Sequence, residues 1–203
     1  MPIVSEEHKR KKKRQILIGA LTCFAKKGYE VATIDDIVRY SGVSKGAIYN
    51  YFKKKEDIYV ELFNLITKES FDQIIEQLKR LNSSFDKIHS LFDFYLEENP
   101  SSLNLNESTI VQLEFQLSSS RNADLMKILD GMYKKANLEI VIQVLVEGIQ
   151  AGEIKKEINT EIYAEIFLSF IDGLYLQKLL FPDIPFKDVI NEQKLSFIHS
   201  IKK

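Results

Sequence analysis

The stretch SGVSKGAIYNYFKKK, residues 41–55, gathers side chains that are well suited to bind a polyanion. Ammonium groups, phenol hydroxyls and a carboxamide alternate there with small and apolar residues. At about 100° per residue, a helix over residues 45–52 has two distinct faces. The polar face carries Lys45, Gly46, Tyr49 and Asn50, and the opposite face carries Ala47, Ile48, Tyr51 and Phe52. The polar side chains on the first of these faces can donate hydrogen bonds to phosphate oxygens and to base edges in a DNA groove.

Gly46 lies on the polar face, where packing against its own module does not explain it. A glycine in a helix interior costs about 1 kcal/mol relative to alanine. Because it has no Cβ, it lets the helix approach another surface closely, and the first residues of a recognition helix are those that reach bases in the major groove. Lys53, Lys54 and Lys55 follow as counter-charges for phosphates. The alternative is an exposed helical turn with a solvated run of lysines.

Three helices are expected to position these groups. Apolar residues recur on one face of a helix over residues 6–27, which Gly28 ends. Thr33 followed by Asp36 predicts a capped second helix, which ends at Gly42. Ser44 then caps the third helix, so that two short helices joined by a tight turn form a helix-turn-helix.

The rest of the chain shows further amphipathic helical patterns and no strand pattern. These patterns cover residues 56–78, 84–96, 109–117, 122–150, 160–181 and 187–201. We therefore expect an all-α protein, with an N-terminal three-helix module followed by a larger helical bundle.

The charge is distributed unevenly along the chain. Residues 1–55 hold 13 Lys and Arg against 5 Asp and Glu, whereas residues 56–203 hold 15 against 24. A basic first quarter on an acidic body indicates a module that binds a polyanion, joined to one that does not. An architectural protein that binds DNA without sequence preference would need basic charge throughout, and the acidic body argues against it.

The segment TIDDIVRYSGVSKGAIYNYFKKKEDIY resembles the signature of the tetracycline-repressor (TetR) family of bacterial transcription regulators. The resemblance extends from about Lys9 to Leu62, and Ser41 stands where the family usually has alanine. It implies a dimeric all-α protein of nine or ten helices. Residues 1–55 would form the DNA-binding domain, and residues 56–203 would form the effector-binding and dimerisation domain.

The resemblance also implies roles for individual residues. Thr33 would open the first helix of the motif at a phosphate, and Tyr49 and Tyr51 would clamp phosphates. Tyr51 falls on the core side of the helical wheel, so its role requires the hydroxyl to reach the rim. The full set of expected DNA contacts is Thr33, Ser44, Lys45, Gly46, Tyr49, Asn50, Tyr51 and Lys55.

The body offers two weaker sets of candidates, and the residues of both sets could equally be plain core. Aromatic and soft side chains that could line a pocket for a small, mostly apolar effector are Phe92, Tyr95, Phe115, Met126, Met132, Tyr133, Phe167 and Tyr175. Apolar residues of the last two helices that could form a dimer interface are Ile162, Ile166, Phe170, Leu174, Val189, Ile190, Phe197 and Ile198.

Enzymatic chemistry is not indicated. His8, His89 and His199 are far apart and show no metal-ligand spacing, and there is no glycine-rich phosphate loop or nucleophile elbow. We expect no catalytic residue, metal or cofactor. The single cysteine, Cys23, and the absence of a signal peptide or membrane span favour the cytoplasm.

The expected function is that of a dimeric repressor released from a palindromic operator by a small, mostly apolar ligand. A ligand-independent regulator or an activator with the same DNA-binding module is the alternative.

Overall fold

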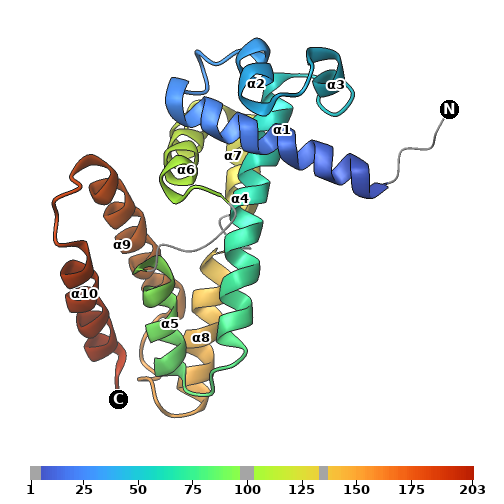
Figure 1. Ribbon diagram of the computed structural model, residues 1–203. Coiled ribbons are helices and arrows are strands. Elements are labelled where there is room, and N and C mark those ends of the chain that lie inside the picture. Colours follow the sequence, from blue (N-terminus) through green and yellow to red (C-terminus); the bar gives the residue numbers. More distant parts are fainter. Residues whose placement is uncertain (1–5, 97–102, 133–136) are drawn as a thin grey trace. The chain divides into compact units, whose positions relative to one another are not determined.

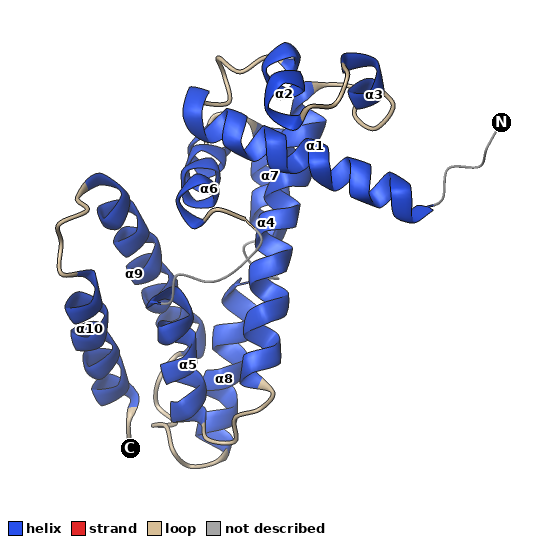
Figure 2. Cartoon of the chain, viewed as in Figure 1, coloured by secondary structure: helices blue, strands red, loops and turns tan. Residues whose placement is uncertain are grey.

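The computed structural model describes residues 6–96, 103–132 and 137–203, and every regular element in these ranges is a helix (Figure 2). The helices are α1 Glu6–Lys27, α2 Ile34–Ser41, α3 Lys45–Tyr49, α4 Lys55–Leu78, α5 Ser84–Leu96, α6 Leu105–Ser119, α7 Ala123–Met132, α8 Glu139–Gln150, α9 Thr160–Leu180 and α10 Phe186–Ile201 (Figure 1). The prediction of an all-α fold with nine or ten helices is confirmed.

The chain forms two compact units, each built from two ranges of the sequence. The first unit combines residues 1–67 with residues 101–125, and the second combines residues 68–100 with residues 126–203. The first unit therefore includes the start of α4 and the whole of α6 in addition to the three N-terminal helices. The division of functions between the two predicted domains stays a prediction.

The apolar face predicted for α1 forms the centre of the first unit. Ile16, Leu17, Ala20, Leu21 and Phe24 are all buried. The residues before Ile16 are exposed or half-buried, so the N-terminal part of α1 does not contribute to this core.

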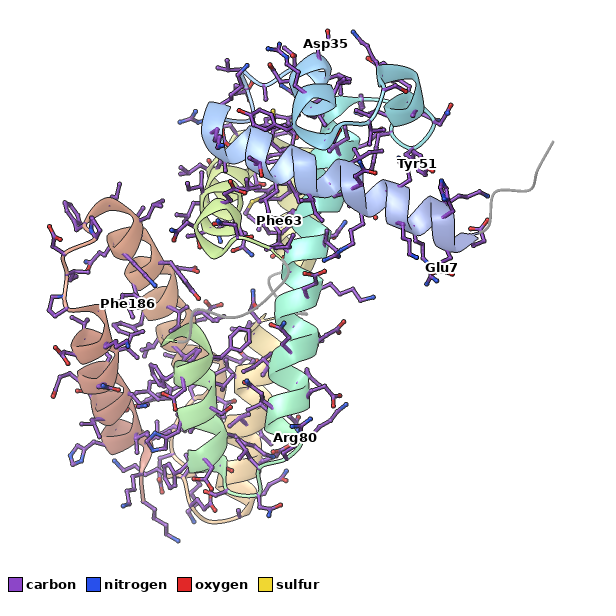
Figure 3. The ribbon with its side chains drawn as sticks, viewed as in Figure 1. Glu7, Asp35, Tyr51, Phe63, Arg80 and Phe186 are labelled. Carbon is purple, nitrogen blue, oxygen red and sulfur yellow. The ribbon has the colours of Figure 1, made fainter. Side chains whose placement is uncertain are left out.

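A cluster of aromatic rings joins α1, α4 and α6 within the first unit. Tyr29 stacks on Tyr59 with ring centroids 4.0 Å apart, and Phe63 stacks on Phe115 at 4.1 Å. Phe24 meets the edge of the Tyr59 ring at 5.4 Å. Each such pair adds about 0.5–1.5 kcal/mol beyond the burial of its area. Figure 3 labels Phe63 on α4.

Two carboxylates attach α6 to α1 and to the turn that follows it. Thr22 Oγ1 donates to Glu107 Oε2 at 2.9 Å, and the Tyr29 backbone N–H donates to Glu114 Oε1 at 2.7 Å. Glu107 and Glu114 are seven residues apart and therefore lie on one face of α6, two turns from each other. These bonds explain why α6 belongs to the first unit.

The core of the second unit is built by α5, α8, α9 and α10, together with the C-terminal part of α4. Phe92 packs its ring edge against Phe167 with centroids 4.7 Å apart and lies 5.8 Å from Phe197. Leu174 and Ile190 are buried in the same cluster. The second unit also contains one isolated antiparallel β-bridge, which pairs Ile154 with Lys202.

Helices α1 and α2 approach each other closely where they cross at Gly19. A Cβ placed on Gly19 would lie 2.5 Å from the Cα and 2.6 Å from the N of Ser41. Gln15 Nε2 donates to the Ser41 carbonyl at 2.8 Å, and the Val43 N–H donates to the Ser41 hydroxyl at 3.2 Å. Serine can replace the family's usual alanine at position 41 because its hydroxyl accepts a hydrogen bond from the Val43 N–H in the turn after α2.

We expect Gly19→Ala to lower the free energy of unfolding by about 1–3 kcal/mol, because the added methyl overlaps backbone atoms of α2. Urea unfolding would measure this change. The control is Gly46→Ala, since a Cβ on Gly46 has nothing within 4 Å. Equal stability of the Gly19 variant and the wild type would contradict the described crossing.

Candidate nucleic-acid interface

The caps predicted for the helix-turn-helix are present. The Asp36 N–H donates to Thr33 Oγ1 at 3.2 Å, and the Thr33 N–H donates to Asp36 Oδ2 at 3.0 Å, which completes a capping box. Gly42 ends α2 with φ +66°, a left-handed conformation that favours glycine. The Ser44 hydroxyl then accepts the Ala47 N–H at the start of α3. These local bonds fix the angle at which the chain enters α3.

The exposed face of α3 is the one predicted from the helical wheel. Lys45, Gly46, Tyr49 and Asn50 are exposed, whereas Ile48 is buried. Helix α3 ends at Tyr49, so Asn50 lies in the turn that follows it. Since nothing lies within 4 Å of a Cβ placed on Gly46, the fold of the chain itself does not require glycine there. Contact of this face with DNA stays a prediction.

Lys45 carries a charge that is available at the surface. Its Nζ lies 3.0 Å from a carboxylate oxygen of Asp35, and both side chains are more than half exposed. The hydrogen bond that Lys45 donates to Asp35 raises the pKa of Lys45, so the ammonium stays protonated. An exposed ion pair contributes little to stability, and a phosphate can therefore replace this carboxylate.

Lys53 and Lys54 are exposed, and their backbones are ordered by Asp57. The N–H groups of Lys53 and Lys54 donate to Asp57 Oδ2 at 3.0 Å and 3.1 Å. This carboxylate satisfies backbone donors at the start of α4 and leaves both ammonium groups exposed, in keeping with the predicted counter-charges.

Lys55 has a different environment from the one expected for a phosphate contact. Its Nζ donates to the carbonyls of Tyr29, Glu30 and Ala32 at 2.6, 3.1 and 2.9 Å, and it lies 4.4 Å from the centroid of the Tyr29 ring. An ammonium group has three N–H donors, and these three carbonyls occupy them. In this structure Lys55 supports the loop that leads into Thr33.

Tyr51 is half-buried after α3, as the helical wheel indicated, and Figure 3 labels it. Hydrogen bonding to Glu6 is the main cause that raises the pKa of Lys9, and an electrostatic interaction with the Tyr51 phenol contributes less. The phenol is therefore near the basic start of α1. Its expected contact with a phosphate stays a prediction.

A buried carboxylate anchors the first helix of the motif. Asp36 Oδ1 accepts from Lys27 Nζ at 2.6 Å and lies 3.1 Å from an Arg39 guanidinium nitrogen, while its other oxygen accepts from Thr33. The hydrogen bond from Lys27, followed by those from Thr33, holds the pKa of Asp36 well below its ordinary value. Asp36 thus ties α2 to the C-terminal end of α1.

The pocket candidates that the structure describes belong to both units. Phe115 is buried in the first unit, whereas Phe92 and Phe167 are buried in the second. Tyr175 is half-buried, and the side chain of Met126 is 48% exposed. Tyr133 and the side chains of Tyr95 and Met132 lie outside the described part of the chain. The effector-binding role of all eight stays a prediction.

The dimer candidates separate into exposed and buried residues. Ile162 and Ile166 are 56% and 51% exposed, and both line a groove between α8 and α9 with Leu138 and Ile142. Leu174, Ile190 and Phe197 are buried within the single chain, which leaves them almost no surface for a partner. The partly buried candidates packed against the same core are Phe170, Val189 and Ile198.

Neither a metal centre nor a membrane span is found in the described ranges. No group of three or more His, Cys, Asp or Glu residues there could hold a metal ion. No helix in these ranges is both long and apolar enough to cross a bilayer.

Comparison with known proteins places this geometry in a family. Residues 16–62 match the model of bacterial regulatory proteins of the tetR family, and residues 91–183 match a tetracyclin repressor-like C-terminal domain. The HTH-type transcriptional regulator YfiR of Bacillus subtilis is 30% identical over 184 residues, which are 90% of this chain and 87% of YfiR. The chain belongs to the tetR family.

Two further proteins extend this result. The fatty acid metabolism regulator protein of B. subtilis is 30% identical to this tetR-family chain over 166 residues, which are 82% of each protein. The crystal structure of FadR from B. subtilis in complex with stearoyl-CoA is 26% identical, with a TM-score of 0.76 over 91% of this chain and 97% of FadR.

A more distant structure shares the fold alone. A transcriptional regulator from Saccharomonospora viridis, solved in complex with choline, is 23% identical, with a TM-score of 0.82 over 96% of this chain and 99% of that protein. The relatives are transcriptional regulators, and this chain is a TetR-family transcriptional regulator with a helix-turn-helix.

Sequence reasoning missed the polar contacts of α6 and the loop-supporting role of Lys55. Glu107 and Glu114 each accept a hydrogen bond from a residue 85 positions away, and no local sequence pattern predicts such a long-range contact. The spacing of seven residues between these two carboxylates was the available signal, because it places both on one face of the helix.

We expect Asp36→Asn to reduce stability at neutral pH and to make stability less sensitive to acid. The pKa of Asp36 is lowered in the folded state, so its contribution is present above the unfolded pKa of about 4 and is lost as the pH falls below it. Urea unfolding at several pH values between 7 and 2 would measure both effects.

The neighbouring Asp35→Asn is the matched control, because the Asp35 side chain is 62% exposed and pairs with an exposed lysine. It should keep the steep acid dependence of the wild type. Acid curves of equal slope for Asp36→Asn and the wild type would contradict the role of the buried carboxylate.

Proposed function

We propose that the chain is a homodimeric repressor that binds a palindromic operator and is released from it by a small, mostly apolar ligand. The observation that carries the DNA-binding part is the open, polar face of α3 around Gly46. Lys45 and Asn50 supply donors beside a position where no Cβ keeps a groove wall at a distance. Tyr49 and the N-terminus of α2 at Thr33 supply donors for phosphates.

A single α3 reads only a few base pairs, so two copies are needed for a specific site. A two-fold dimer binds two half-sites about 34–36 Å apart, one helical turn of DNA, or a multiple of that distance. The proposal therefore requires a surface on which two copies of the chain can meet.

Helix α9 carries such a surface. One stripe of its exposed residues follows a spacing of four, three, four, three and four, which is the heptad pattern of a helix-to-helix contact. The residues of this stripe are Ile162, Ile166, Ser169, Gly173, Leu176 and Leu180. The four large members are between 43% and 58% exposed. A Cβ on Gly173 would have nothing within 4 Å, so the glycine is not required by the chain's own packing.

We infer that α9 packs against α9 of the second copy, with Ser169 and Gly173 at the crossing, where small residues let two backbones approach. The groove beside Ile162 and Ile166 would receive side chains of the partner. Of the residues predicted to form the dimer interface, Ile162 and Ile166 remain in the proposed one, whereas Leu174, Ile190 and Phe197 belong to the core of the single chain.

The ligand part of the proposal is supported by the relative that was crystallised with stearoyl-CoA. A long acyl chain is a mostly apolar effector of the kind expected from the sequence. Helix α6 lies within the segment matched by the C-terminal domain model, yet it bonds to α1 and to the Tyr29 turn. A ligand that favours another position of α6 would therefore change the DNA-binding unit through these two bonds.

Selection of random-sequence DNA by the purified protein, followed by gel shifts, tests this function. A palindromic site should emerge, and stearoyl-CoA should release it. Loss of all sequence preference would defeat the regulator proposal. Specific binding that no acyl-CoA or fatty acid weakens would favour the alternative, a ligand-independent regulator or an activator with the same α3.

We expect Gly46→Leu to abolish specific DNA binding while leaving the helical spectrum and the dimer intact, because the added side chain holds the groove away from α3. Gel shifts with the selected site would measure the loss. Gly131→Leu is the matched control, since Gly131 is also an exposed helical glycine with nothing within 4 Å of a Cβ. Normal binding by Gly46→Leu would refute the assignment of this face.

We expect Ile166→Glu to convert the dimer to a monomer, because it places two charges in an apolar helix contact. Sedimentation velocity would measure the change. Leu195→Glu, at a residue of α10 that is 58% exposed and outside the stripe, is the control and should leave the dimer unchanged. Dissociation by the control alone would move the interface to α10.

A further inference from the structure

The first turns of α1 carry six consecutive cations that the described function does not use. Residues 9–14 read KRKKKR and lie in the helical part of the chain, before the first buried residue, Ile16. In Figure 1 this part of α1 extends toward the N-terminus beyond α2 and α3. Figure 3 labels Glu7 near its beginning.

These cations are unfavourable for the free helix. Like charges three and four residues apart repel one another, and the cation in the first turn also faces the partial positive charge of the helix N-terminus. Glu6 and Glu7 offset part of this effect through exposed ion pairs with Lys9 and Lys11 at 2.7 Å and 2.9 Å. Lys13 pairs with Glu61 on α4 at 2.6 Å.

Lys12 differs from these three lysines because its partner is neutral. Its Nζ donates to Gln15 Oε1 at 3.1 Å, and Gln15 Nε2 donates to the Ser41 carbonyl at 2.8 Å. Ser41 is the last residue of α2 and directly precedes the turn to α3. Gln15 therefore connects an uncompensated ammonium group to the turn of the helix-turn-helix.

The helical wheel places Lys12 on the side of α1 that faces this motif. Lys13, about 100° away, lies 5.6 Å from the Phe52 ring that follows α3. Gly19, seven residues after Lys12 and thus on nearly the same side, meets Ser41 of α2. Lys12 lies between these two directions. Arg10 points away from it, about 160° around the helix.

We propose that Lys12 binds a DNA phosphate beside the groove entered by α3, with Gln15 as the residue that positions it. This inference rests on the proposed DNA-binding function and extends its footprint from the helix-turn-helix to the first turns of α1. The contact is to the backbone of DNA, so it strengthens binding without reading sequence.

The test compares Lys12→Ala with Arg10→Ala on two duplexes, the selected palindrome and a scrambled duplex of the same composition. Affinities are measured at several salt concentrations between 0.05 and about 0.3 M, a range over which log affinity falls linearly with log salt. Lys12→Ala should reduce the salt slope by about 0.9 and weaken binding about eightfold at 0.1 M salt on both duplexes. Arg10→Ala should change neither quantity by a comparable amount.

A stability measurement separates this role from a structural one. Removal of a cation near the N-terminus of α1 should leave the melting temperature unchanged or raise it, so weaker DNA binding by Lys12→Ala cannot come from unfolding. A melting temperature that falls in parallel with affinity would overturn the proposal.

Three binding outcomes would also overturn it. An unchanged salt slope for Lys12→Ala excludes the phosphate contact, and equal losses for both variants indicate a diffuse charge effect instead of an oriented residue. A loss confined to the palindrome indicates base recognition. If the wild type prefers no sequence, the result counts against the proposed regulator function. Failure of that function can therefore be distinguished from failure of the Lys12 contact alone.

Discussion

The position of the recognition helix depends on the close crossing of α1 and α2 at Gly19 and Ser41. At this point the two backbones approach so closely that even one methyl group on Gly19 would overlap α2. The crossing holds the end of α2, and the left-handed Gly42 turns the chain directly into the cap of α3. Because only the short turn separates Ser41 from α3, a shift at the crossing would move the exposed face of α3 by a similar amount. The base contacts proposed for α3 would tolerate little such movement.

The other end of α2 is set by the loop of residues 29–32, which is held from two elements. Lys55 on α4 binds three of its carbonyls, and Glu114 on α6 accepts the Tyr29 N–H. Asp36 then ties the first turn of α2 to Lys27 at the end of α1. These charged groups act on backbone and caps, so they orient a helix without taking part in its exposed face. Helix α6 thereby helps to position the start of α2, although it belongs by sequence to the C-terminal domain of the family.

Local patterns were sufficient to predict most of the helices and the caps. The bounds of α1, the Thr33–Asp36 capping box, the Gly42 end of α2 and the two faces of α3 follow from residue types within a few positions of each other. Helix α6 begins at Leu105, earlier than its apolar pattern indicated, because Asn104 caps it. Within residues 122–150, predicted as one helical pattern, the structure describes α7 and α8, and residues 133–136 between them lie outside the described ranges. Long-range contacts could not be predicted in this way, since an ammonium group has the same local signature whether it binds a phosphate or, as at Lys55, three carbonyls of a distant loop.

Three features of this chain are unfavourable for the isolated molecule, and each has a matching partner in the proposed complex. A glycine within the short helix α3 reduces helix stability, the cations of residues 9–14 repel one another along α1, and the stripe on α9 exposes large apolar side chains to water. In the proposed complex a DNA groove would lie against the glycine of α3, and a DNA phosphate would bind the cations of α1. A second copy of the chain would cover the stripe on α9. The partners also depend on each other, because two recognition helices fit one palindrome only if a dimer sets their separation. The same residues therefore account for both the cost to the free chain and the specificity of the bound one.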